Sequence, residues 1–295
     1  MIVITTPTGD IGRQTLNLLL TSGTEKLRVI ARDPARLPAA VRDRVDVVAG
    51  SHRDPAVVDR AFTGADAVLW VIPPDPQATD VVAAYTGFTR AAADAFATHG
   101  VTHVVGVSAL GRGTPVAGDA GLVTAALAMD DLIASTGVAY RALANPGFMD
   151  NLLRQVDSIR AGSFGFTVAP DRSMPLAATR DIAAVAADLL QDRSWTGTAE
   201  VPVLGPENYT PNDLARIMTE ALDRPVQYRR QSFEELGAGM TRYGASPAVV
   251  RGMVDMMRAK EAGLDDGVER TPQTASPTSF RQWCEEVLKP AVAAG

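Results

Sequence analysis

The chain has 295 residues, of which 46% are hydrophobic and 21% charged, and its net charge is −6, which suits one large two-lobed unit or two domains. No basic cluster marks a nucleic-acid site, no apolar run reaches the roughly eighteen residues of a membrane span, and the three histidines lack the spacing of metal ligands. The single cysteine, Cys284, excludes an internal disulfide, and Met1 leads directly into the first predicted strand, so we expect a cytoplasmic protein. We expect it to be a monomer or homodimer that binds a small-molecule substrate. We expect it to bind no nucleic acid, membrane or metal.

The first 36 residues predict the opening of a dinucleotide-binding unit. A β-branched strand, Met1–Thr5, leads into a tight turn with two glycines, and leucines at helical spacing follow before a second strand, Leu27–Ala31. Because glycine has no side chain, a pyrophosphate can approach the backbone there and face the free N–H groups at the helix start. The alternative is an ordinary strand-to-helix turn. The residues expected at the cofactor are Thr6, Thr8, Gly9, Asp10, Ile11, Gly12 and Arg13.

The end of the second strand indicates which dinucleotide binds. An NAD site usually offers a carboxylate to the ribose hydroxyls at this place, whereas an NADP site offers arginine to the 2′-phosphate. Here Arg32 follows the strand and Arg36 lies one helical turn later. Asp33 lies one position too late and is a candidate helix cap. We therefore expect NADP(H) to be preferred over NAD(H); the alternative is that both arginines are solvated surface charges.

The third and fourth strands add further candidate cofactor contacts. Val45–Ala49 is followed by Ser51 and His52, which we expect beside the adenine, and by Asp54, which serves equally well as a helix N-cap. Ala67–Ile72 is a continuous apolar run, typical of a strand buried on both faces. Because ligands bind at the carboxyl ends of the strands of a doubly wound sheet, this strand end should border the cofactor. The residues expected there are Ile72, Pro73 and Pro74.

The fifth and sixth strands should lie beneath the nicotinamide. His103–Ser108 ends in a polar residue and precedes a glycine-rich segment, 109–121, which we expect to be a mobile loop. Val138–Ala144 leads into the segment 145–151. The cofactor contacts expected here are Val107, Ser108, Pro146 and Gly147, and the substrate pocket is expected to include Phe148, Met149 and Asn151.

The remaining residues predict a smaller, mostly helical lobe. A helix beginning near Thr179, a strand at Ala199–Leu204, a helix capped by Thr210 and a glycine-broken helical stretch, 232–264, follow in order. We expect a doubly wound α/β parallel sheet, a Rossmann domain, over residues 1–150 with 178–204 packing back onto it. Residues 151–177 and 205–295 would form the substrate lobe. Four methionines could form an adaptable lid or plain core: Met240, Met253, Met256 and Met257.

Four stretches resemble the NmrA-like family of atypical short-chain dehydrogenase/reductases. They are the glycine turn at 6–13, Ala-Arg-Asp-Pro at 31–34, the strand and turn at 137–152, and Thr-Arg-Asp-Ile-Ala-Ala-Val-Ala-Ala at 179–187. The resemblance implies a Rossmann lobe with a small C-terminal lobe closing over a substrate cleft. The chain departs from the family at Thr6, where glycine is usual, at Asp10, and in the helix at 124–131, which lacks the frequent lysine.

The catalytic group is the least defined part of this prediction. Lysine occurs only at 26, 260 and 289, and no tyrosine has a lysine four residues later, so the Tyr-x-x-x-Lys arrangement of classical short-chain dehydrogenases is absent. Hydride transfer to a quinone or conjugated enone needs less acid–base help than reduction of a ketone. Ser108 is the first catalytic candidate, although it could be a strand-end hydroxyl bonded to backbone. Tyr140 is a weaker one because a mid-strand tyrosine is more often core.

Three functions fit these features. The first is an NADPH-dependent reductase of a small, apolar carbonyl, enone or quinone, and it ranks highest. The second is an NADP(H)-sensing regulatory protein without turnover, which the missing Tyr/Lys pair favours. The third is a non-redox pathway enzyme on the same scaffold. Abundant arginine and alanine with scarce lysine point to a GC-rich bacterial source.

Overall fold

The computed structural model describes residues 1–23 and 25–294, and a seven-stranded parallel sheet forms its larger lobe. The strand order, β10-β6-β5-β4-β1-β2-β3, reverses direction at β1 and β4, which confirms the predicted doubly wound α/β fold. Strand β4 is buried along its whole length, as its continuous apolar run predicts. The strands are β1 Ile2–Thr5, β2 Leu27–Ala31, β3 Asp46–Ala49, β4 Ala67–Trp70, β5 His103–Ala109, β6 Ala139–Asn145 and β10 Thr198–Pro202.

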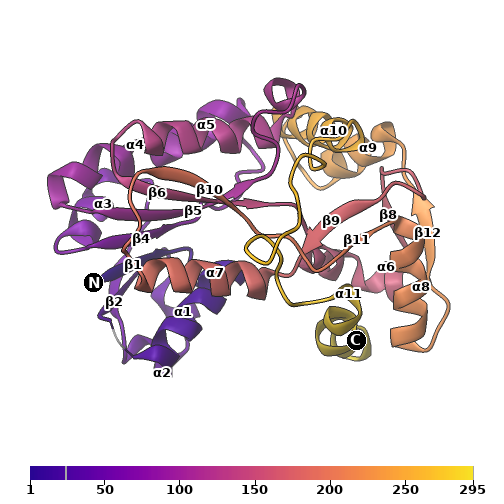
Figure 1. Cartoon of the computed structure of the whole chain (residues 1–295), viewed down its shortest axis with the longest axis horizontal. Helices are drawn as coiled ribbons and strands as arrows, with labels where there is room; N and C mark the ends of the chain where they lie inside the picture. The colour runs from indigo at the N-terminus through magenta and orange to yellow at the C-terminus, as the bar shows by residue number, and fades with distance from the viewer. Residues whose placement is uncertain (24, 295) are drawn as a thin grey trace.

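Helices cover both faces of this sheet (Figure 1). On one face, α1 (Asp10–Ser22) packs beside α7 (Thr179–Gln191), and the Gln14 side chain donates a 2.8 Å hydrogen bond to Thr179. The opposite face carries α3 (Pro55–Phe62), α4 (Val81–His99) and α5 (Leu122–Ala134). Each layer buries its own apolar cluster against the sheet, so the strands are held from both sides.

The second lobe has its own core and two small sheets. Met149, Phe164, Met218, Phe280 and Trp283 are fully or almost fully buried in that core. Its strands are β7 Gly147–Phe148, β8 Ser163–Phe166, β9 Met174–Ala177, β11 Asn208–Tyr209 and β12 Gln227–Arg230, in the orders β11-β9-β7 and β12-β8. Its α-helices are α6 Val156–Arg160, α8 Pro211–Leu222, α9 Phe233–Arg242, α10 Pro247–Glu261, α11 Phe280–Trp283 and α12 Lys289–Ala293.

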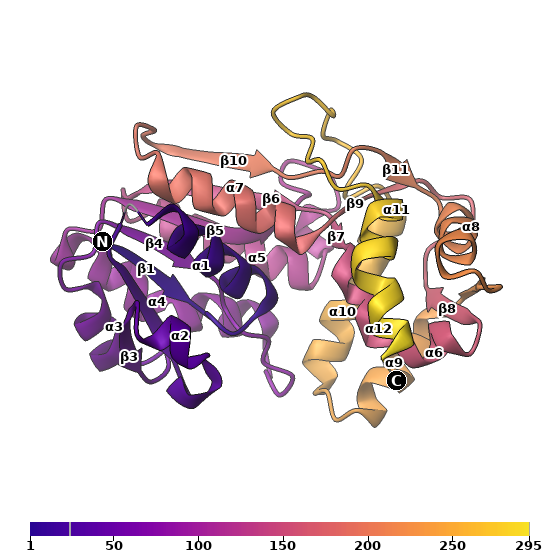
Figure 2. The ribbon, with the colours of Figure 1, turned by 90° about the horizontal axis from the view of Figure 1, so that it is seen from below.

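The chain passes between the lobes more than once, as Figure 2 shows. After β9 it returns to the larger lobe as α7 and β10, and β10 pairs with β6 at the edge of the sheet. It then goes back to the second lobe through β11 and α8. Thr210 caps α8 in a capping box with Asp213, as its position before Pro211 predicts.

Several element boundaries differ from the prediction. The sequence also predicts a helix over Gln77–His99, but α4 begins only at Val81, because the Asp80 side chain caps it by accepting from the N–H of Ala83. The stretch expected as one broken helix is two helices, and Ser246 caps the second, α10. Of the short strands of the second lobe, the sequence predicts only one, at Val226–Arg229, and the structure has β12 there. Two- and four-residue strands carry too few residues to show a period.

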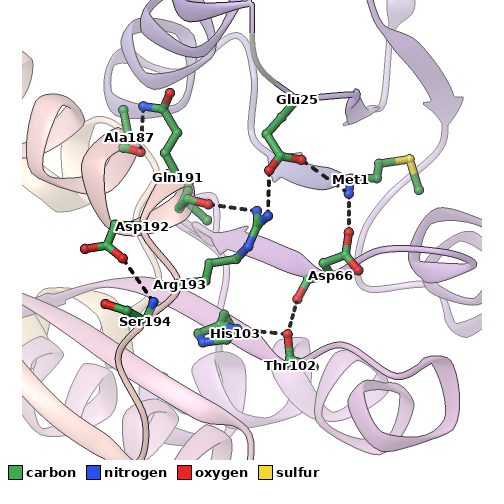
Figure 3. Close-up of polar contacts among 11 residues, drawn as sticks. Met1, Glu25, Asp66, Thr102, His103, Ala187, Gln191, Asp192, Arg193 and Ser194 are labelled. Carbon is green, nitrogen blue, oxygen red and sulfur yellow. Dashed lines mark hydrogen bonds and ion pairs between the residues drawn. The ribbon is translucent and has the colours of Figure 1, made fainter.

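The edge of the sheet where the parallel strands begin is closed by charged groups (Figure 3). The Met1 ammonium pairs with Asp66 before β4 and lies 3.6 Å from Glu25 before β2. Arg193, which follows α7, reaches the same Glu25 at 2.5 Å. This cluster therefore ties α7 to the amino ends of the strands, away from the carboxyl edge. No helix within the described residues is both long and apolar enough to cross a membrane.

Candidate active site

The turn after β1 is shaped by one glycine and one strained threonine. A Cβ on Gly12 would lie 2.2 Å from the Thr6 carbonyl oxygen, so only glycine lets α1 start this close to the strand. Thr6 has a φ of 51°, and its carbonyl accepts a 3.0 Å hydrogen bond from Gly9. Gly9 is the N-cap of α1, and no side chain caps the helix there. The first N–H groups of α1 are therefore available to an anion.

The side chain of Thr6 explains why threonine can stand at this position of the turn. Its hydroxyl donates a 2.7 Å hydrogen bond to the carbonyl oxygen of Val71, the residue after β4. The N–H of Val71 donates to the Thr5 hydroxyl at 2.7 Å, so the ends of β1 and β4 are joined twice. These bonds hold the turn in place although the glycine usual in the resembled family is missing.

His52 contributes to the same junction. Its Nε2 lies 3.0 Å from the Val71 carbonyl oxygen, and its ring meets Trp70 and Phe88 edge-on. Burial lowers the pKa of His52 to about 4, so the ring is neutral at pH 7 and Nε2–H donates this bond. Asp54, the neighbouring alternative, caps α3 by accepting from the N–H of Ala56. Ser51 accepts a hydrogen bond from the N–H of Arg53.

Three arginines surround the outer side of the turn. A cavity of about 310 Å³ is lined by Thr8, Arg13 and Arg36, among others, and a smaller one beside it by Thr6, Arg32 and His52. Within the described residues, the guanidinium groups of Arg32 and Arg36 form no hydrogen bond or ion pair. Arg13 has only Asp10, at 3.9 Å and with both side chains exposed. Free N–H groups and unpaired guanidinium groups together fit a phosphorylated dinucleotide.

The other predicted cofactor residues lie in the core or along neighbouring cavities. Ile11 and Val107 pack into the core beneath the sheet, and Pro146 is buried. Ile72, Pro73 and Pro74 line a cavity of about 260 Å³ against α4 and the α9–α10 hairpin. Gly147 lines a second cavity, described below.

Ser108 and Tyr140, the two catalytic candidates, meet at a carboxylate that the sequence analysis did not single out. Both donate hydrogen bonds to Asp130 of α5, with the Tyr140 hydroxyl at 2.5 Å. Arg112 lies 3.7 Å from the same carboxylate. Burial raises the pKa of Asp130 to about 6, although both hydrogen bonds and Arg112 oppose that shift.

Tyr140 lies too deep to touch a substrate in this structure. It is fully buried, and Gly106 makes room for its hydroxyl, since a Cβ there would lie 2.2 Å from that oxygen. Burial, followed by the nearby Asp130, raises the pKa of Tyr140 well above its ordinary value. Ser108 is 7% exposed and is the next-to-last residue of β5, at the carboxyl edge of the sheet, whereas Tyr140 is the second residue of β6. Asp130 is the acidic residue on the otherwise apolar buried face of α5, and this exception to the pattern could have identified it from the sequence.

A cavity of about 140 Å³ lies in the second lobe, next to β7. Phe148 and Asn151 line it, and their place in a substrate pocket stays a prediction. Met149 does not: its side chain is fully buried in the core of the second lobe, because a 3₁₀ helix, Met149–Gln155, begins there and turns it inward. Met256 and Met257 of α10 line this cavity, whereas Met240 and Met253 line the one beside Pro73. A lysine, Lys260, completes the wall.

Comparisons with known proteins agree with this geometry. A family model described as NAD(P)H-binding matches residues 7–193. A (4-alkanoyl-5-oxo-2,5-dihydrofuran-3-yl)methyl phosphate reductase of Streptomyces griseus is 30% identical over 294 residues and 97% of each chain. An NAD(P)H azoreductase of Xenophilus azovorans is 25% identical over 100% of this chain and 99% of its own.

Solved structures share the fold. The NADPH complex of an NADPH-dependent quinone oxidoreductase of Escherichia coli superimposes with a TM-score of 0.76 at 21% identity, covering 100% of this chain and 99% of its own. The NADP complex of NmrA, a negative transcriptional regulator, gives 0.71 at 13% identity, covering 99% and 97%.

Proposed function

This chain belongs to the NAD(P)H-binding family, and we propose that it is an NADPH-dependent reductase that transfers hydride to a small, largely apolar enone, quinone or carbonyl compound. Membership confirms the predicted resemblance to NmrA-like proteins and the predicted class, an NAD(P)H-dependent oxidoreductase. The cofactor preference and the substrate are our proposals.

The unpaired guanidinium groups of Arg32 and Arg36 carry the proposal of NADP(H). Both arginines lie at the carboxyl end of β2 and border the cavities around the glycine turn. Asp33, the only carboxylate at this strand end, is committed to capping, since it accepts from the N–H of Ala35 at 3.0 Å. A 2′-phosphate would therefore find two free cations there, whereas the carboxylate at this strand end already uses one oxygen to accept a backbone N–H.

The cavity next to β7 supports an apolar, conjugated substrate. Its walls are mainly apolar, with Phe148, Met256 and Met257 among them. When bound, the reduced nicotinamide supplies hydride, and the chain orients the two reactants and excludes water. The relative from Streptomyces griseus is named for a substrate whose ring carbonyl is conjugated to a C=C bond, which supports the choice of an enone. We place the substrate where the Rossmann domain, 1–150, meets the smaller lobe.

A turnover screen tests this proposal. Purified protein is incubated with NADPH or NADH and a panel of acceptors: an acyl-butenolide with and without a phosphate ester, a naphthoquinone, and an azo dye. We expect oxidation of NADPH with at least one conjugated carbonyl compound, and slower oxidation of NADH. Tight NADPH binding without turnover of any acceptor would favour a cofactor sensor, and product formation without net cofactor consumption would favour a non-redox enzyme.

A further inference from the structure

A largely buried ion pair lines the cavity next to β7. Lys260, in the last turn of α10, places its ammonium nitrogen 2.5 Å from a carboxylate oxygen of Asp265. The two side chains are only 16% and 8% exposed. Both line the same apolar cavity as Phe148 and Asn151.

The hydrogen bonds of this pair are incomplete. Asp265 uses one oxygen, and its other oxygen is buried without a partner. The Lys260 ammonium has three donors, and within the described residues only the bond to Asp265 is present. Burying two charges is costly unless their remaining hydrogen-bonding capacity is used. The other ion pair at this cavity, Arg172 with Asp266 at 2.6 Å, is more exposed.

We propose that Lys260 is the catalytic acid of this enzyme: it binds the carbonyl oxygen of the substrate and donates a proton to it. This inference rests on the proposed function, the NADPH-dependent reduction of a conjugated carbonyl compound. Asp265 is a positioning residue that holds the ammonium at the cavity wall. The sequence lacks the Tyr-x-x-x-Lys arrangement, and in this proposal a lysine of the second lobe serves as the acid instead.

The proposed step is balanced. Hydride addition to the β-carbon of an enone forms a C–H bond and moves the C=C electron pair toward the carbonyl carbon, which leaves negative charge on oxygen. The Lys260 ammonium gives its proton to that oxygen, forming an enol that tautomerises to the saturated carbonyl compound. The neutral amine then takes a proton from water. In total, NADPH and one proton are consumed for each substrate reduced.

The decisive comparison uses Lys260→Met and, as a matched control, Glu261→Gln. Glu261 is the next residue of α10 and forms an ion pair with Arg230 outside this cavity. General acids typically contribute 10² to 10⁴-fold, so we expect kcat to fall at least about 10²-fold in Lys260→Met, with NADPH affinity unchanged. Glu261→Gln should keep wild-type kcat.

Two further variants separate catalysis from folding. Lys260→Met combined with Asp265→Leu replaces the pair with apolar side chains, which should bring the melting temperature back toward the wild-type value while kcat stays low. Lys260→Arg keeps the charge but does not release a proton, so it should restore KM and not kcat.

The inference is overturned if the wild type oxidises NADPH with an enone and Lys260→Met does so within about twofold. It is also overturned if the double variant recovers kcat together with stability. Failure of the wild type to turn over any acceptor would refute the proposed function itself, and this outcome is seen before any variant is made.

Discussion

The Asp130 carboxylate accepts hydrogen bonds from both catalytic candidates, Ser108 and Tyr140. Its pKa rises to about 6 because it is buried, from the ordinary value of 3.8. In the unfolded chain it ionises near pH 4, so between about pH 4 and pH 6 the folded protein holds a proton that the unfolded chain has lost. The stability contributed by this group therefore falls as pH rises through that window, by roughly 3 kcal/mol in all.

Replacing the Asp130 carboxyl tests whether its ionisation makes folding stability depend on pH. In Asp130→Asn the fall in unfolding free energy between about pH 4 and pH 6 should be reduced by that amount, as measured by urea denaturation at several pH values. Asp131→Asn is the matched control, because Asp131 is exposed and pairs with Arg112 at 2.8 Å. Identical pH profiles for wild type and Asp130→Asn would show that Asp130 does not titrate in this way.

The role of an individual residue could be predicted where it depends only on neighbouring residues in the sequence. Gly12 was identified from its place between a strand and a helix, and the contact with Thr6 explains that requirement. The meeting of Ser108 and Tyr140 at Asp130 depends on how β5, β6 and α5 pack, which no local pattern contains. Met149 was expected at the substrate pocket but lies in the core of the second lobe. A rotation of the chain by one residue decides whether a side chain there faces the cavity or the core.

At the scale of elements, the α9–α10 hairpin closes over the edge of the larger lobe. Ser246, between the two helices, donates its N–H to the carbonyl of Pro76 at 2.8 Å. Gly121, before α5, meets α10 so closely that a Cβ would lie 2.0 Å from the Gly252 carbonyl oxygen, and its φ is 54°. The hairpin and the segment 73–78 thus form one wall of the cavity beside Pro73.

Substituting Gly121 should loosen this wall. Gly121→Ala adds a clash and backbone strain at the contact with α10, so we expect faster hydrogen exchange over 233–261 and a higher KM for the substrate. Gly118→Ala is the control, because a Cβ at Gly118 meets nothing within 4 Å. Unchanged exchange in Gly121→Ala would mean that this contact does not hold the hairpin.

Elements of the larger lobe were predicted nearly in full because buried parallel strands and amphipathic helices alternate regularly there. The segment 109–121 was expected to be a mobile loop. It contains a 3₁₀ turn, Ala117–Asp119, and its end packs against α10, a contact between segments far apart in the sequence. Elements of the second lobe were harder to predict, because its short strands pair across chain crossings between lobes.

In the whole molecule, a charged cluster and the candidate active site occupy opposite edges of one sheet. The charged cluster of Met1, Glu25, Asp66 and Arg193 joins the amino ends of the strands (Figure 3). The glycine turn, the unpaired arginines and the cavities beside Pro73 and β7 lie at the carboxyl edge. This division is the one that a doubly wound sheet imposes on a ligand site.

The most direct measurement is a calorimetric titration of the protein with NADPH and NADH, repeated on Arg32→Ala. Arg90→Ala is the matched control, since Arg90 is an exposed and unpaired arginine of α4 within the described residues. We expect NADPH to bind at least about tenfold more tightly than NADH, and Arg32→Ala to remove most of that difference, because a guanidinium–phosphate contact is worth about 1.5–3 kcal/mol. Equal affinities for the two cofactors, or an unchanged preference in Arg32→Ala, would contradict an NADP(H) site at the end of β2.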